Sequence, residues 1–169
     1  METKYRKICT EIPVPESIPL LKRLQAVQPN SLDWQAPIIW DKAEGYNVFD
    51  KYGNKWLDMS SGIVVASAGH ARQEVLDAVK KQIDKNMVYN FTFPSEIRLQ
   101  LLEKLMDITP DNFQKGFLMS SGSESTENAL KLMRGWALRT VSKDKNVIVS
   151  FENAFHGRTL GSQLMGGLP

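Results

Sequence analysis

Apolar side chains recur at the spacing of a helix face in three parts of the chain. One part is residues 73–85, a second runs from Ser95 to a stop at Pro110, and a third runs from about Ser123 to Arg139. This spacing predicts an amphipathic helix in each part, because it lines one side of a helix with apolar groups and leaves charged groups elsewhere. The apolar positions are Val75, Leu76, Val79 and Ile83 in the first, Ile97, Leu101 and Leu105 in the second, and Ala129, Leu130, Met133, Trp136 and Ala137 in the third.

Short runs of β-type residues separate these helices. Residues 38–40, 46–49 and 55–58 are predicted strands, and the glycine-containing loop between the last two predicts a hairpin. Residues 116–119 are a short apolar run, predicted to be a strand that leads into a turn. Residues 146–151 form a continuous apolar run, which is typical of a strand buried on both faces of a parallel sheet. With a helix between them, these two runs form a βαβ unit, and the chain is predicted to have an α/β fold.

Four prolines interrupt the first part of the chain, at Pro13, Pro15, Pro19 and Pro29. Proline removes a backbone donor and restricts the residue before it, so only a short helix in residues 20–27 is expected here. Residues 1–37 are therefore predicted to form an N-terminal arm.

Composition and charge give no indication of a nucleic-acid, membrane or metal partner. A hydrophobic fraction of 42% with a net charge of +2 is ordinary for a soluble globular protein and gives no field that favours nucleic acid or an anionic membrane. The single Cys9 and two histidines far apart in sequence provide neither an intramolecular disulfide nor a metal site. We expect no export signal from residues 1–7, which no apolar stretch follows, and the most apolar run, residues 63–68, is far shorter than the ~20 residues that span a bilayer. We expect a soluble cytoplasmic protein with no metal.

The first candidate site is the run Ser121-Gly122-Ser123-Glu124, at the junction of a predicted strand and a predicted helix. Backbone N–H groups and the helix dipole converge on an anion at such a junction. Glycine allows close approach of a ligand, and serine hydroxyls can donate to phosphate oxygens. The same residues also fit a capping box, in which Ser121 and Glu124 satisfy the helix start without any ligand. The residues alone leave both interpretations open.

The second candidate site is Phe155-His156-Gly157-Arg158, just after the next predicted strand. It is expected at the carboxyl edge of the same sheet, where α/β folds bind ligands. An aromatic ring beside a small residue can cover a planar cofactor. Alone, Phe155 also fits a core position and His156 a surface or capping position.

Together these motifs resemble the class III pyridoxal-phosphate-dependent aminotransferases, the family of ornithine, acetylornithine and 4-aminobutyrate aminotransferases. Residues 50–58, Ser61-Gly62-Ile63 and Gly69-His70 are similar to the family's small-domain hairpin and following loop. The resemblance extends from about Ile38 to the end of the chain. It implies fold type I, with a small-domain segment in residues 38–94 and the beginning of a large domain with a mixed or parallel sheet in residues 95–169.

The resemblance also implies roles for individual residues. Pyridoxal 5'-phosphate would be held at its phosphate by Ser121, Gly122 and Ser123, and at its ring by Phe155 with His156 beside it. Two further residues would meet the substrate: Arg158 at a carboxylate and Ile63 at the entrance of the substrate path. The chain departs from the family at Ala71-Arg72, where a His-Pro pair is common, and at Ser125, where many relatives have Ala.

The family's catalytic groups are expected outside these residues. Transamination needs a Schiff-base lysine and an acidic partner for the pyridine nitrogen, and both family positions lie beyond Pro169. Lys131 is predicted to face solvent and cannot substitute. The chain is thus expected to be an N-terminal fragment, inactive alone. The full-length homodimer would transfer an amino group from an amino acid or omega-amine donor to a 2-oxo acid.

Other interpretations remain open from the sequence. A family aminomutase, epimerase or decarboxylase would share this cofactor site and differ mostly beyond these residues. The chain could instead be a non-catalytic truncated product. A generic phosphate-binding α/β domain would be favoured if Phe155 and Ser123 faced different sides.

Overall fold

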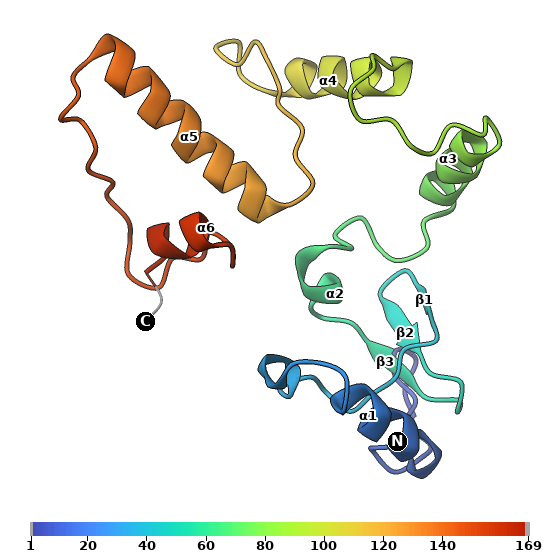
Figure 1. Cartoon of the computed structure of the whole chain (residues 1–169). Coiled ribbons are helices and arrows are strands. Elements are labelled where there is room, and N and C mark those ends of the chain that lie inside the picture. The colour runs from blue at the N-terminus through green and yellow to red at the C-terminus, as the bar shows by residue number, and fades with distance from the viewer. Residues whose placement is uncertain (1, 168–169) are drawn as a thin grey trace. The chain divides into compact units, whose positions relative to one another are not determined.

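The computed structural model describes residues 2–167 and consists of helices joined by loops, with one small sheet (Figure 1). The chain divides into two compact units between Phe91 and Thr92, and each unit is described by itself. None of the described helices has the length and apolar character needed to cross a membrane. The predicted boundaries after residues 37 and 94 stay predictions.

The first unit contains a three-stranded antiparallel sheet in the order β1-β2-β3. Its strands are β1 (Lys42–Glu44), β2 (Asn47–Phe49) and β3 (Lys55–Leu57). Val48, in the central strand, is 2% exposed and opposes Trp56 of β3. The predicted hairpin is confirmed. The prediction of a strand at residues 38–40 was wrong, because these apolar residues line a cavity and pairing begins only at Asp41, whose N–H donates to the carbonyl of Phe49.

Buried polar groups hold the turn between β2 and β3. Asp50 Oδ1 accepts hydrogen bonds from the N–H groups of Tyr52 and Asn54, both at 2.9 Å. The fully buried Asn54 accepts from Cys9 N–H at 2.8 Å and donates to Thr10 Oγ1 at 2.7 Å. The N-terminal segment is thereby attached to the hairpin, and its polar groups are satisfied within the unit.

Helices complete the first unit. Two 3-10 turns, η1 (Pro15–Ser17) and η2 (Asn30–Leu32), flank α1 (Ile18–Gln25), which lies close to the helix predicted for residues 20–27. The helix predicted at residues 73–85 is confirmed as α3 (Gln73–Ile83). Between the sheet and α3 lies the short turn α2 (Ser61–Val64), which carries Ile63.

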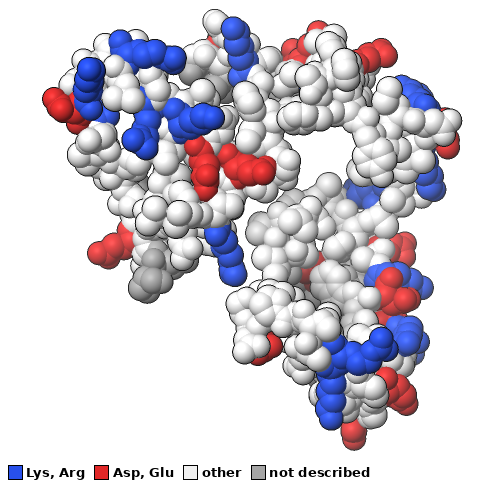
Figure 2. Space-filling model, viewed as in Figure 1, with Lys and Arg blue, Asp and Glu red and all other residues white. Residues whose placement is uncertain are grey.

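The second unit contains α4 (Glu96–Ile108), α5 (Gly122–Thr140) and α6 (Leu160–Met165). The helices predicted from Ser95 and from about Ser123 are confirmed as α4 and α5. Figure 2 shows acidic side chains toward the start of α5 and Lys and Arg gathered toward its end. This distribution complements the helix dipole.

The two strands predicted in the second unit do not form. Residues 116–119 and 146–151 have no strand assignment, and Phe117, Val147 and Val149 are largely exposed. The prediction was wrong for the described residues because a strand needs a neighbour to satisfy its backbone, and neither segment pairs with one. The described chain is therefore mixed helix and sheet, and the expected βαβ unit is represented by its helix alone.

Candidate functional site

The start of α5 is capped by its own side chains. Ser121 has extended backbone and its Oγ accepts a hydrogen bond from Glu124 N–H at 3.2 Å. The Glu124 carboxylate accepts from Ser120 N–H at 2.9 Å, one residue before the position of an ideal capping box. Capping is thus part of the role of these residues.

The cap leaves room for an anion. Within the described residues, no acceptor is recorded for the N–H groups of Gly122 and Ser123. A Cβ atom built on Gly122 would meet nothing within 4 Å. Two N–H groups at the start of a 19-residue helix are therefore without an acceptor among the described residues, which is the arrangement that binds phosphate groups in many proteins.

The second motif lies directly against this helix start. Arg158 N–H donates to Ser123 Oγ at 3.1 Å. Gly157 has φ +122°, and a Cβ atom there would overlap the Ser123 hydroxyl and lie 2.7 Å from its Cβ. Only glycine fits this close approach without displacement of the helix. The two motifs, separated by more than thirty residues, are adjacent.

Thr126 and Glu127 hold the second motif on α5. Thr126 Oγ1 donates to the carbonyl of His156 at 2.8 Å and also bonds the buried hydroxyl of Ser162 at 2.7 Å. Glu127 Oε1 accepts from the Thr159 hydroxyl and from Gly161 N–H at 3.0 Å. The hydrogen bond from Thr159 has the largest effect in lowering the pKa of Glu127, and the bond from Gly161 N–H lowers it further. The loop after His156 is therefore fixed on one side of the helix.

The candidate residues of this unit are accessible. Phe155 is 64% exposed, His156 is half-buried and Arg158 is exposed. No ion pair of the Arg158 guanidinium is recorded with any other residue in the described part of the chain. The unit thus combines two unengaged N–H groups, an exposed ring and an exposed cation on neighbouring segments. Lys131 is also exposed on α5, as predicted.

A family model described as aminotransferase class-III matches residues 30–165 of the chain. The chain belongs to this family. Its sequence is 40% identical over 128 residues to a succinylornithine transaminase of Photorhabdus laumondii, covering 76% of this chain and 31% of that protein. It is 35% identical over 156 residues to a 4-aminobutyrate aminotransferase of Mycobacterium leprae, covering 91% and 34%. The chain spans about a third of the length of these class III relatives.

Solved aminotransferases share the structure of this segment. A transaminase from the marine bacterium Virgibacillus superposes with a TM-score of 0.78 and 28% identity, over 90% of this chain and 36% of that one. The PMP-bound form of an aminotransferase from Vibrio fluvialis gives a TM-score of 0.77 and 27% identity, over 87% and 34%. The expected family and fold are thereby confirmed.

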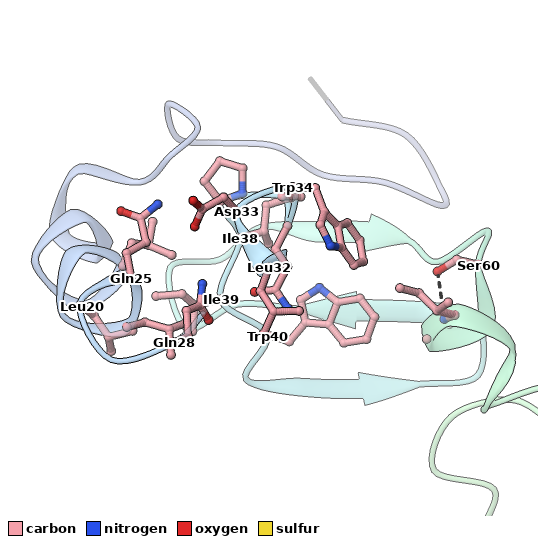
Figure 3. A pocket seen from close by; sticks show the side chains of 17 residues that line it. Leu20, Gln25, Gln28, Leu32, Asp33, Trp34, Ile38, Ile39, Trp40 and Ser60 are labelled. Atoms are coloured by element: carbon pink, nitrogen blue, oxygen red, sulfur yellow. Dashed lines mark hydrogen bonds between the residues drawn. The ribbon is translucent and has the colours of Figure 1, made fainter. Parts of the chain in front are cut away.

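In this class III chain, Ile63 belongs to the first unit and lines a cavity of about 540 Å³. Trp34 and Trp40 line the same cavity, and Figure 3 shows their rings on the side where Ser60 lies. Ile63 is itself exposed, with 60% of its surface accessible. The cavity is contained within one unit.

Sequence reasoning missed a pair beside this cavity. His70 Nε2 lies 2.7 Å from Asp58 Oδ2, and the Asp58 side chain is only 3% exposed. The hydrogen bonds from His70 and then from the Ser60 hydroxyl hold the pKa of Asp58 well below its usual range. The spacing Asp58-x-Ser60, typical of a turn in which aspartate binds the following backbone, was the available signal. The role of Thr126 as a link between the motifs had no such signal.

Proposed function

We propose that the full-length protein is a pyridoxal-phosphate-dependent aminotransferase. This chain spans about a third of the length of the class III relatives that it matches. The contact of Gly157 and Arg158 with Ser123 at the open start of α5 is the observation that carries the proposal. It brings the start of α5 and the Phe155-His156 motif together. A generic helix cap alone would not require that contact.

The residues present fit the cofactor. The unengaged N–H groups of Gly122 and Ser123, with the hydroxyls of Ser121 and Ser123, are the donors for its phosphate. Each hydroxyl accepts one backbone bond through its oxygen and keeps its proton to donate. The exposed Phe155 ring, with His156 beside it, would cover the pyridine ring. The PMP-bound form of the aminotransferase from Vibrio fluvialis supports a pyridoxal-type group here.

When bound, the cofactor supplies an electron sink for bonds at the amino carbon of the substrate. The residues of this chain would bind and orient the cofactor. Arg158, exposed and without an ion-pair partner among the described residues, would bind a substrate carboxylate through its planar fork. Ile63 would line the path of the amino donor. The lysine of the exchange step would lie outside these residues.

The proposed substrates are an amino acid or omega-amine donor and a 2-oxo acid acceptor, and the proposed protein is a cytoplasmic homodimer. The names of the relatives support amino-group transfer, since they include succinylornithine transaminase and 4-aminobutyrate aminotransferase. Succinylornithine and 4-aminobutyrate carry an amine remote from a carboxylate, and an exposed arginine could bind that carboxylate.

The complete reading frame tests the proposal. Purified protein is expected to show a visible cofactor band and to form keto acid from at least one of ornithine, acetylornithine, succinylornithine and 4-aminobutyrate. Gly122→Asp is expected to abolish the band, because it adds bulk and negative charge where the phosphate lies. Gly122→Ala is the matched control for folding, since its Cβ meets open space. A normal band in folded Gly122→Asp protein would refute the assignment.

A further inference from the structure

The turn α2 has the left-handed helical conformation. Residues 61–64 have φ of +52°, +60°, +61° and +60° in order. Two backbone hydrogen bonds between residues four apart close the turn: Val64 N–H donates to Ser60 O at 2.8 Å, and Val65 N–H donates to Ser61 O at 2.9 Å. Three of these residues are not glycine, and two are β-branched. Positive φ is a rare and costly conformation for such residues, so their surroundings must hold it.

Asp58 supplies that restraint. Its Oδ2 accepts from Gly62 N–H at 2.7 Å, inside the turn. Its Oδ1 accepts from the N–H and hydroxyl of Ser60 at 2.9 and 2.7 Å. The carboxylate therefore binds both the approach to α2 and its second residue. Because the side chain is almost wholly buried, water does not compete for these bonds.

His70 fixes Asp58 to the sheet. Its ring nitrogen binds Asp58 Oδ2, and its backbone exchanges two hydrogen bonds with Gly45, at 2.7 and 2.8 Å, in the turn between β1 and β2. The ring also packs at right angles to Trp40, with centroids 6.0 Å apart. The pair thus connects α2, the β1-β2 turn and one wall of the cavity.

We propose that Asp58 and His70 are positioning residues that hold the left-handed turn Ser61–Val64, and through it Ile63, at the wall of the cavity and on the proposed path of the amino donor. This inference rests on the proposed function for the identity of the ligand. The conformation of the turn does not depend on it. Ile63 lines the cavity, whereas the neighbouring Val64 is 81% exposed and does not.

Asp58→Asn in the complete protein is the first test. An amide cannot accept from both Ser60 and Gly62, because one of its two terminal atoms is a donor. We expect the KM for the amino donor to rise about tenfold, with kcat and the cofactor band close to those of the unmodified protein. Backbone hydrogen exchange of residues 60–65, measured by mass spectrometry without substrate, should accelerate by a similar factor.

Asn54→Ala is the matched control. It removes a fully buried amide from the same unit, but it acts on the β2-β3 turn and not on the cavity. It should lower stability and accelerate exchange around residues 50–55, with the donor KM unchanged. If the KM for the amino donor rose equally in both variants, loss of stability would explain the effect of Asp58→Asn. That result would overturn the proposal.

Relief of strain is the second test. Val64→Gly removes a β-branched side chain from positive φ without altering the cavity wall. Added to Asp58→Asn, it should return the donor KM and the exchange of residues 60–65 to within about threefold of the unmodified values. A double variant no better than Asp58→Asn would contradict a role in holding the turn.

The remaining outcomes are also decisive. If Asp58→Asn does not fold, His70→Ala replaces it, because this substitution leaves every backbone contact of Asp58 in place. His70→Ala is expected to raise the donor KM and to accelerate the exchange of residues 60–65. His70→Gln should give values closer to those of the unmodified protein. Unchanged exchange and KM in His70→Ala would then overturn the proposal. Absence of a cofactor band and turnover in the unmodified protein would instead refute the proposed function, while exchange of residues 60–65 would still decide whether the pair holds the turn.

Discussion

The β1-β3 sheet and the apolar segments 116–119 and 146–151 differ in where their backbone partners lie. Each strand of the sheet pairs with a strand that follows or precedes it within a few residues, through tight turns. The two apolar segments are separated by the whole of α5 and pair with nothing in the described residues. Antiparallel hairpins close locally, whereas a parallel sheet needs strands brought together across helices.

The same difference appears in side-chain burial. Val48 of β2 is almost completely buried, whereas Val149, in the apolar run 146–151, is 86% exposed. The first unit also satisfies its buried polar groups internally, through Asp50, Asn54 and Asp58. The second unit has its polar contacts where the two motifs meet and its apolar segments uncovered. Local pairing completes the β1-β3 sheet, whereas the two apolar segments have no partner among the described residues and would depend on other strands to join a sheet.

The largest expected effect tests that dependence. In the complete protein we expect residues 146–151 to join a sheet, so Val149→Asp should bury an unpaired charge and remove most of the soluble, folded protein. Lys143→Asp, in the preceding turn, is the charge-changing control and should be tolerated. Soluble yield and thermal unfolding are the measurements. A Val149→Asp protein as stable as the control would mean that the segment stays exposed in the complete protein as well.

The second effect tests the contact between the two motifs. Gly157→Ala places a methyl group against Ser123 and forces the loop away from α5, so cofactor affinity should fall about a hundredfold. Gly135→Ala, inside α5, is the matched control: its Cβ would come no closer than 3.8 Å to Arg139, and alanine favours the helix. Cofactor titration by absorbance compares the two. Similar affinities would show that the contact with Ser123 is dispensable.

The sequence predicted the elements whose partners are near in the chain. The helical spacing of Val75 to Ile83 and the Gly-containing loop of residues 50–54 depend on local chemistry, and α3 and the hairpin agree with them. Residues 38–40 were predicted wrongly because apolar runs look alike whether they pair as a strand or line a cavity.

The candidate site divides in the same way. Ser121 as a helix cap follows from residue type alone. The predicted strand-helix-strand order placed the two motifs at one edge of a sheet, but the contact of Gly157 with Ser123 was not predicted, since no local pattern encodes a contact across more than thirty residues. Thr126 and the left-handed turn of α2 were not predicted, because a threonine inside a helix and a valine at positive φ carry no distinctive spacing.

A smaller effect concerns acid. The pKa of Asp58 is lowered in the folded protein, chiefly by His70, so the carboxylate is more stable there than in the unfolded chain. Its contribution is therefore fully present above the unfolded pKa of about 4 and is lost as the pH falls below that value. Relative to its intrinsic rate, hydrogen exchange of residues 60–65 should accelerate below about pH 4, ahead of that of β1-β3. In Asp58→Asn the acceleration should be present already at neutral pH and show no such step.

The smallest expected effect is the change in the free energy of unfolding when Ser125, one helical turn after the cap residue Ser121, is substituted. Ser125 donates its hydroxyl to Ser121 O at 3.0 Å, but that carbonyl already accepts from Ser125 N–H, and the side chain is exposed. Ser125→Ala removes a redundant bond and introduces a better helix former, so the free energy of unfolding should change by less than about 0.5 kcal/mol. Ser121→Ala removes the only side-chain acceptor for Glu124 N–H recorded in the described residues and should cost about 1 kcal/mol. Urea unfolding and cofactor titration of the two variants in the complete protein separate these roles. Since Ser121 is also a proposed phosphate donor, only its substitution should weaken cofactor binding. An equal loss of affinity in Ser125→Ala would place the phosphate one turn further along the helix than Gly122 and Ser123.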